Sequence, residues 1–318
     1  MPLFLPFIFV TMFPTIIICL IILGIEFITG IIANGLMIVV NCREWIRSRK
    51  LTCCDMILTS LGISRFFLQC MININNILTH LRQDMNELCT ILRIVTVFWI
   101  FLTTLNLWLA TCLSVFYCVK IANFSQSLFL WLKLRISGLV PQLLMGSFLV
   151  SLVICLPSIN TIDRKYIDHS MNNLSGNTTG ECRYKVDFSS RFFISSMLGY
   201  TSPFIIFIIS SILLIKSLWR HSKRMEKTTS TSRDTVTEAH VRAIKGLISF
   251  IFFYISYFVA LVIFLLELCT ISTYYVWIVI MGAYPSGHSV ILILGNPKLK
   301  RVAVRAFHYA GWAKLVLG

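Results

Sequence analysis

The feature that most constrains this chain is an apolar run, Ile94 to Val119, that contains no charged residue. A helix rises about 1.5 Å per residue, so about twenty residues span the hydrocarbon core of a bilayer, and this run is longer. Its polar residues, Thr103, Thr104, Asn106 and Ser114, would be costly against lipid, which offers no hydrogen-bond partners. They are therefore predicted to face neighbouring helices or an internal cavity, and either arrangement requires a bundle of several helices.

Six further apolar runs predict an all-α membrane protein. We expect a single bundle of seven transmembrane helices over residues 1–318, with spans at about 15–41, 55–79, 91–118, 139–157, 192–217, 246–267 and 275–295. The polar stretch 158–191 is predicted to be a long extracellular loop. In the tail, 297–318, basic and apolar residues alternate at helical spacing, which predicts a short amphipathic helix on the cytoplasmic membrane face.

Composition excludes several other classes. Only 13% of the residues are charged, against about a quarter in soluble domains. The net charge of +15 would suggest a nucleic-acid partner in a soluble protein, but here the lipid bilayer explains it, because short cytoplasmic loops are basic. The eleven cysteines show no metal-ligand spacing, and no nucleophile–base pairing or phosphate loop is visible. Neither a metal, a cofactor nor an enzyme activity is therefore expected.

The distribution of basic residues predicts the orientation. The loops after the first, third and fifth spans, with the ends of those spans and the tail, hold 20 of the 28 Lys and Arg residues. This bias places the amino terminus outside and the carboxyl terminus in the cytoplasm. The sequons at Asn173 and Asn177 then fall in the long outer loop, where glycosylation is possible. A transporter or channel is the alternative from the residues alone, but only Glu26 and Arg65 are charges embedded within spans.

Several segments resemble the type 2 bitter taste receptors, a family of G-protein-coupled receptors. The similar segments are LTSLGISRF around Arg65, LWLATCLSVFYCVKIANFS from Leu107 to Ser125, AHVRAIKGLISF from Ala239 to Phe250 and YPSGHSVILILGNPKL from Tyr284 to Leu299. The third span ends in Phe-Tyr-Cys, not Asp-Arg-Tyr, so the larger rhodopsin-like class matches poorly. Vomeronasal type 1 chemoreceptors are the nearest alternative. The resemblance implies a plasma-membrane receptor that binds small bitter compounds and activates a heterotrimeric G protein.

The same resemblance implies a ligand site in the outer halves of the spans. Trp99 aligns with a tryptophan that often stacks on ligands in the family, and Thr103, four residues later, shares its helix face. Where some relatives have an acidic residue this chain has Ile278, which argues for neutral or apolar agonists. The expected ligand-binding residues are Trp99, Thr103, Tyr257, Asn75, Asn76, Asn106 and Ile278.

Arg65 is the strongest physical anomaly, because a cation near the middle of a span is costly unless it finds partners or water. We expect it to face the interior near Asn34 and Ser289. Two interpretations stay open: a polar lock that differs between inactive and active arrangements, and a purely stabilising hydrogen-bond hub. The residues expected to act as an activation switch are Arg65, Asn34, Tyr254, Ser289 and Tyr117.

A basic rim is predicted around the cytoplasmic mouth. The positive-inside rule accounts for most of its charge, and the KIANFS resemblance adds G-protein contact. The expected contact residues are Lys120, Ile121, Ala122, Asn123, Lys216, Arg220 and His221. On the outer side, Cys89, Cys182 and Cys269 lie where oxidation is possible, although the family typically lacks a bridge there.

Overall fold

A computed structural model describes residues 5–80, 86–122, 127–172, 190–226, 233–266, 268 and 271–317. Within this part of the chain, eight helices follow one another: α1 (Leu5–Ser48), α2 (Cys53–His80), α3 (Asn86–Ile121), α4 (Ser127–Asn172), α5 (Ser190–Glu226), α6 (Arg233–Leu265), α7 (Ile271–Gly295) and α8 (Pro297–Leu317). The first seven are long and apolar enough to cross a membrane, so the predicted seven-helix architecture is confirmed.

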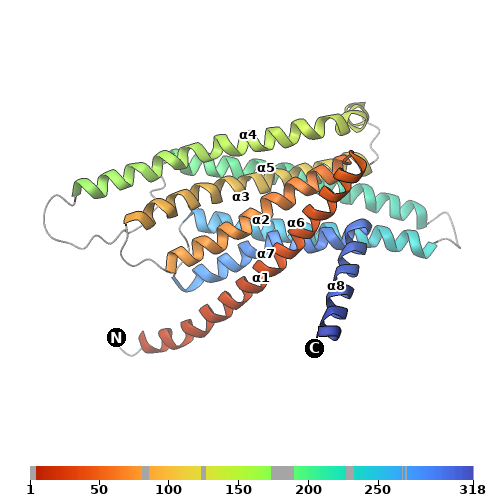
Figure 1. Ribbon diagram of the computed structural model, residues 1–318. Coiled ribbons are helices and arrows are strands. Elements are labelled where there is room, and N and C mark those ends of the chain that lie inside the picture. The colour runs from red at the N-terminus through yellow and green to blue at the C-terminus, as the bar shows by residue number, and fades with distance from the viewer. Residues whose placement is uncertain are drawn as a thin grey trace.

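Six of the spans form a closed ring. Helix α1 packs on α2, α2 on α3, α3 on α5, α5 on α6, α6 on α7, and α7 returns to α1. Helix α4 lies outside this ring, against α3, α2 and α5 (Figure 1). The amino terminus lies at one end of the bundle, and α8 leaves from the other end, across the axes of the spans (Figure 1).

Apolar side chains cover the outside of the bundle, and many polar ones lie inside it. On α1 an exposed stripe of isoleucines recurs every three or four residues: Ile17, Ile21, Ile25, Ile28 and Ile32. Asn34 and Met37, on the same helix, are fully buried against the other spans. This arrangement suits a bundle in lipid, where apolar surface costs nothing but an unpaired polar group does.

The helices extend beyond their predicted boundaries. Helix α1 begins at Leu5 and passes through Pro14, and α4 passes through Pro157 and continues to Asn172, so residues 158–172, expected as loop, are helical. A proline removes one hydrogen bond, which a long helix survives as a kink and not a break. The remainder of the expected outer loop, including both sequons, lies outside the described residues.

The junction of α1, α2 and α8 is held by Lys298. Its ammonium forms an ion pair with Glu44 of α1 and lies 3.5 Å from an Asp55 carboxylate oxygen of α2. It also donates a hydrogen bond to Asn41 Oδ1 at 3.1 Å. Asp55 is itself fixed at the start of α2, where its backbone N–H donates to Thr52 Oγ1 at 3.1 Å. These contacts explain why α8 turns across the end of the bundle.

The contact between α4 and α5 depends on Gly199. A Cβ atom at Gly199 would lie 2.8 Å from Ile154 Cγ2, whereas a Cβ at Gly146, on α4, meets nothing within 4 Å. We predict that Gly199→Ala destabilises the bundle by about 1–3 kcal/mol through overpacking. Gly146→Ala should be neutral or stabilising, because Ala favours helix over Gly by about 1 kcal/mol. Thermal unfolding of the purified protein in detergent measures both, and equal Tm values for the two variants would contradict this packing.

Candidate functional site

The buried guanidinium of Arg65 is the centre of a polar network between helices. Its Nε donates to Asn106 Oδ1 of α3 at 3.1 Å. Its Nη1 donates to Ser289 Oγ at 3.2 Å, and its Nη2 donates to Tyr284 Oη at 3.3 Å and lies 2.5 Å from His288 Nδ1. Ser289, Tyr284 and His288 all belong to α7, so Arg65 joins α2 to α3 and α7.

All four of these partners are neutral groups. A guanidinium can only donate hydrogen bonds, so His288 Nδ1 must accept one, and its proton therefore resides on Nε2. The Arg65 Cζ atom also lies 5.0 Å from the centroid of the Tyr284 ring, within range of a cation–π interaction. The positive charge is thus stabilised by several dipoles and one aromatic ring face.

A second set of bonds connects this network to α1. Ser289 Oγ lies 2.7 Å from Asn34 Oδ1 and 2.8 Å from the carbonyl oxygen of Pro285, and these two acceptors compete for its single proton. The Asn34 amide donates to the Gly30 carbonyl at 2.8 Å and to the Pro285 carbonyl at 3.4 Å. Asn34 therefore meets Arg65 through Ser289, and four helices converge at this point.

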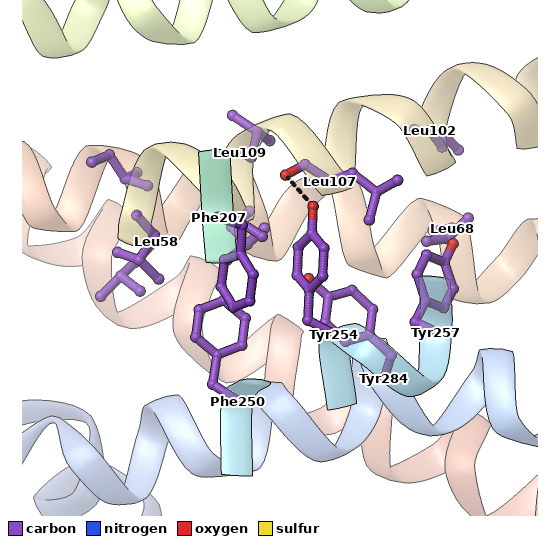
Figure 2. Close-up of a cluster of buried hydrophobic side chains, with 14 of the residues drawn as sticks. Leu58, Leu68, Leu102, Leu107, Leu109, Phe207, Phe250, Tyr254, Tyr257 and Tyr284 are labelled. Atoms are coloured by element: carbon purple, nitrogen blue, oxygen red, sulfur yellow. Dashed lines mark hydrogen bonds between the residues drawn. The ribbon is translucent and has the colours of Figure 1, made fainter. Parts of the chain in front are cut away.

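Aromatic side chains of α6 pack beside the network. The Tyr254 ring stacks on Phe207 of α5 with 4.0 Å between centroids, and Phe250 stacks on the His288 imidazole at 3.7 Å. The Tyr254 hydroxyl donates to the Leu107 carbonyl of α3 at 3.4 Å, drawn as the dashed line in Figure 2. Any movement of α6 therefore changes contacts on α3, α5 and α7 together.

The outer candidates Thr103 and Tyr257 contact each other and lead to the same network. Both are fully buried, and the Tyr257 hydroxyl donates to Thr103 Oγ1 at 3.4 Å. The Tyr257 ring stacks on Tyr284 with 4.8 Å between centroids, and both rings are seen in Figure 2. Trp99, one turn before Thr103, packs edge-on against Phe264 of α6 at 5.6 Å. An unbroken series of contacts thus runs from Thr103 to the partners of Arg65.

The other predicted ligand residues have different surroundings. Ile278 is buried in the core on α7, and Asn75 is partly buried. Asn76 is buried, and its Nδ2 has no hydrogen-bond partner among the residues that the structure describes, which makes it a donor suited to a ligand acceptor. Asn106 bonds to Arg65 and so belongs to the polar network.

At the predicted inner end of the bundle, the exposure of the predicted contact residues varies. Lys120, Ile121, Lys216 and Arg220 are exposed. Ala122 is fully buried in a small cluster with Cys118 of α3 and with Leu214 and Leu218 of α5. Its short side chain fits against α5. It therefore does not lie on the exposed surface where a contact residue was expected. Asn123 and the side chain of His221 lie outside the described residues.

Tyr117 links α3 to α2 near this inner end. Its hydroxyl lies 3.4 Å from the Cys54 Sγ atom, at hydrogen-bonding distance for sulfur. Cys54 lies next to Asp55, which contacts Lys298. Tyr117 is therefore close to the junction that positions α8.

One carboxylate oxygen of Glu26 lacks the interior pairing that an embedded carboxylate suggests, as far as the described residues go. Its Oε2 atom is buried and has no hydrogen-bond partner within the described residues. It lies against Gly282 of α7, where an added Cβ would approach Oε2 to 2.5 Å, so a larger residue there would require the Glu26 side chain to shift. The side chains of Cys89, Cys182 and Cys269 are not among those described. Within the described part of the chain, no group of three or more His, Cys, Asp or Glu side chains is arranged to bind a metal ion.

Tyr284 and His288 are functional candidates that the sequence reasoning did not select. Both lie in a segment quoted for its resemblance and are four residues apart. They therefore share a helix face with each other, but Ser289 is one residue from His288 and five from Tyr284, so its expected place near Arg65 gave no direct signal for either.

Comparison with known proteins gives a consistent match over most of the chain. The family profile described as "Taste receptor protein (TAS2R)" matches residues 12–310. The chain is 38% identical over 291 residues to taste receptor type 2 member 7 of Papio hamadryas, with 88% of this chain and 89% of that protein covered. It is also 38% identical over 295 residues to taste receptor type 2 member 8 of Pongo pygmaeus, with 88% and 92% covered.

The polar network allows a matched test of one hydroxyl. We predict that Ser289→Ala destabilises the protein by about 1–3 kcal/mol, because it leaves Arg65 Nη1 and Asn34 Oδ1 without their buried partner. Ser286→Ala is the control, since within the described residues the buried Ser286 hydroxyl bonds only to carbonyls of its own helix, at Gly282 and Ala283. Thermal unfolding in detergent should show a clearly larger loss for Ser289→Ala, and equal losses would contradict the network.

Proposed function

We propose, from the premise that this chain belongs to the TAS2R taste receptor family, that it is a G-protein-coupled receptor that binds small bitter compounds in an outer cavity. Agonist binding there activates a heterotrimeric G protein at the inner end. The observation that best supports this proposal is the contact series Thr103–Tyr257–Tyr284–Arg65, because it joins the outer candidate residues to the buried centre.

The outer residues suit neutral, partly aromatic ligands. Trp99 offers an aromatic face or edge, and the Thr103 and Tyr257 hydroxyls offer donors and acceptors. The Asn76 amide adds a donor that no described residue partners, and Asn75 and Ile278 complete the wall on α2 and α7. Ile278 supplies no charge, so the site has little to offer an ammonium group.

The proposed mechanism begins at the weak hydrogen bond between Tyr257 and Thr103. The Tyr257–Thr103 bond is long at 3.4 Å, so a ligand hydroxyl or carbonyl can replace it at small cost. A shifted Tyr257 ring would move against Tyr284, which both bonds to Arg65 and receives its cation–π contact. Arg65 would then exchange neutral partners, and the agonist can bias this exchange only by its difference in affinity for the two arrangements.

The inner end would complete the response. Lys120, Ile121, Lys216 and Arg220 form the exposed part of the proposed G-protein surface. Ala122 lies between α3 and α5, so it would contact a G protein only after these helices separate. Release of Tyr117 from Cys54 would accompany that opening.

The proposed location is the plasma membrane, with the amino terminus outside and the tail in the cytoplasm. The distribution of basic residues supports this orientation. Asn173 and Asn177 are then the proposed glycosylation sites of the outer loop.

A cell assay tests the ligand site. Cells carrying this chain and a promiscuous G protein should release calcium on exposure to one or more compounds of a bitter panel. Trp99→Ala should then raise the half-maximal agonist concentration by about tenfold, which corresponds to about 1.4 kcal/mol of lost contact. Phe98→Ala is the control, because the adjacent Phe98 is exposed on the lipid side of α3. Full potency in a Trp99→Ala receptor that reaches the surface would remove Trp99 from the site.

A second assay separates the two interpretations of Arg65. If its contacts differ between states, Arg65→Ala should abolish the calcium response while surface staining persists. If Arg65 is a stabilising hub alone, the same variant should lose surface expression, and the receptors that remain at the surface should respond with normal potency.

A further inference from the structure

Three exposed tryptophans lie near the end of the bundle from which α8 leaves. They are 51%, 52% and 56% exposed and lie near the end of α1, the start of α4 and the end of α5: Trp45, Trp131 and Trp219. Each is followed four residues later by a cation: Arg49, Arg135 and Lys223. Residues four apart are neighbours on a helix surface, so this spacing brings a cation to an indole ring.

In two of the pairs the cation stacks on the ring. Arg135 Cζ lies 5.3 Å from the centroid of the Trp131 ring, and Lys223 Nζ lies 5.6 Å from that of Trp219. Both distances are within the range of a cation–π interaction. The inference concerns these two pairs, Trp131–Arg135 on α4 and Trp219–Lys223 on α5.

The two helices run in opposite directions, yet both pairs hold the cation at the level of the indole. Side chains on a helix lean toward its amino-terminal end, so residue i+4 covers residue i. On α4 this direction leads out of the membrane, and Arg135 extends outward to Trp131. On α5 it leads into the membrane, and Lys223 extends inward to Trp219. Indole rings favour the headgroup region, so both cations are held at that depth.

The surface beside each pair is apolar and faces outward. Leu130 and Leu134 flank the α4 pair, and Leu134 is 80% exposed. On α5, the exposed Ile212 lies two turns before Trp219 on the same helix face. Each site therefore combines a cation, an interfacial ring and apolar surface toward the membrane interior. A phospholipid presents the complementary order: phosphate, glycerol and acyl chains.

We propose that the Trp131–Arg135 and Trp219–Lys223 pairs bind anionic phospholipids of the cytoplasmic leaflet. The phosphate contacts the cation, the glycerol region contacts the indole, and the acyl chains lie along Leu134 on α4 and Ile212 on α5. A guanidinium that stacks by its face still directs its N–H edges outward, where they match phosphate oxygens. The sites rest on the proposed orientation of the chain, and they require neither agonist nor G protein.

Lipid retention tests the sites on the purified full-length chain. The protein is reconstituted in nanodiscs of phosphatidylcholine and phosphatidylserine and moved to mild detergent, and the lipids that stay bound are identified by native mass spectrometry. Arg135→Gln and Lys223→Gln combined should reduce the retained ratio of phosphatidylserine to phosphatidylcholine by about fivefold, and each alone should reduce it by less, because the other site remains. Trp131→Leu should reduce it by about twofold or more at unchanged net charge.

Arg47→Gln is the matched control, because it removes one exposed cation from the same end of the bundle. Its near neighbour Trp45 is two residues away, and residues at that spacing do not face each other on a helix. An equal loss in Arg47→Gln, or no loss in Trp131→Leu, would overturn the proposal and leave only a diffuse basic surface. Arg135→Lys should retain phosphatidylserine, and circular dichroism verifies that each variant is folded. The lipid measurement does not depend on a response to bitter compounds. A failure of the lipid proposal can therefore be distinguished from a failure of the receptor assignment.

Discussion

The bundle depends on finding hydrogen-bond partners for one buried positive charge. Arg65 lies on α2 with no exposure, and lipid can solvate neither its charge nor its donors. Its partners must therefore come from other spans, and they come from α3 and α7, with α1 joined through Ser289. This requirement brings together helices far apart in sequence and is consistent with the closed ring in which α7 returns to α1.

The choice of neutral partners has energetic consequences. A buried ion pair is strongly destabilised when one member leaves, because an uncompensated charge remains. Arg65 instead divides its donors among an amide, a hydroxyl, a phenol and an imidazole, so exchanging one of them leaves the others in place. The aromatic rings of α6 contact two of these groups, since Phe250 stacks on His288 and Tyr257 stacks on Tyr284.

The sequence predicted the spans and the inward polar face well, because hydropathy and lipid chemistry determine both. It also placed Arg65 near Ser289, which the structure confirms as a contact. The ends of the helices were harder to predict from the sequence. Pro157 marks an end only if the helix cannot tolerate a kink there, and α4 continues to Asn172. Rotations about helix axes were the other difficulty, since the burial of Ala122 and the isolation of Glu26 Oε2 depend on how neighbouring helices are turned.

The order in which the chain is made gives the Arg65 network a role in assembly. Synthesis proceeds from the amino terminus, so α2 enters the membrane before any of its partner groups on α3 and α7 exist. Until α7 is inserted, Asn106 of α3 is the one of these four partners that Arg65 can reach. The contact between Glu26 and Gly282 also forms late, because Gly282 belongs to α7. The last span thus completes the bundle, and a ribosome that stops before α7 leaves the Arg65 charge without three of the four hydrogen-bond partners described above.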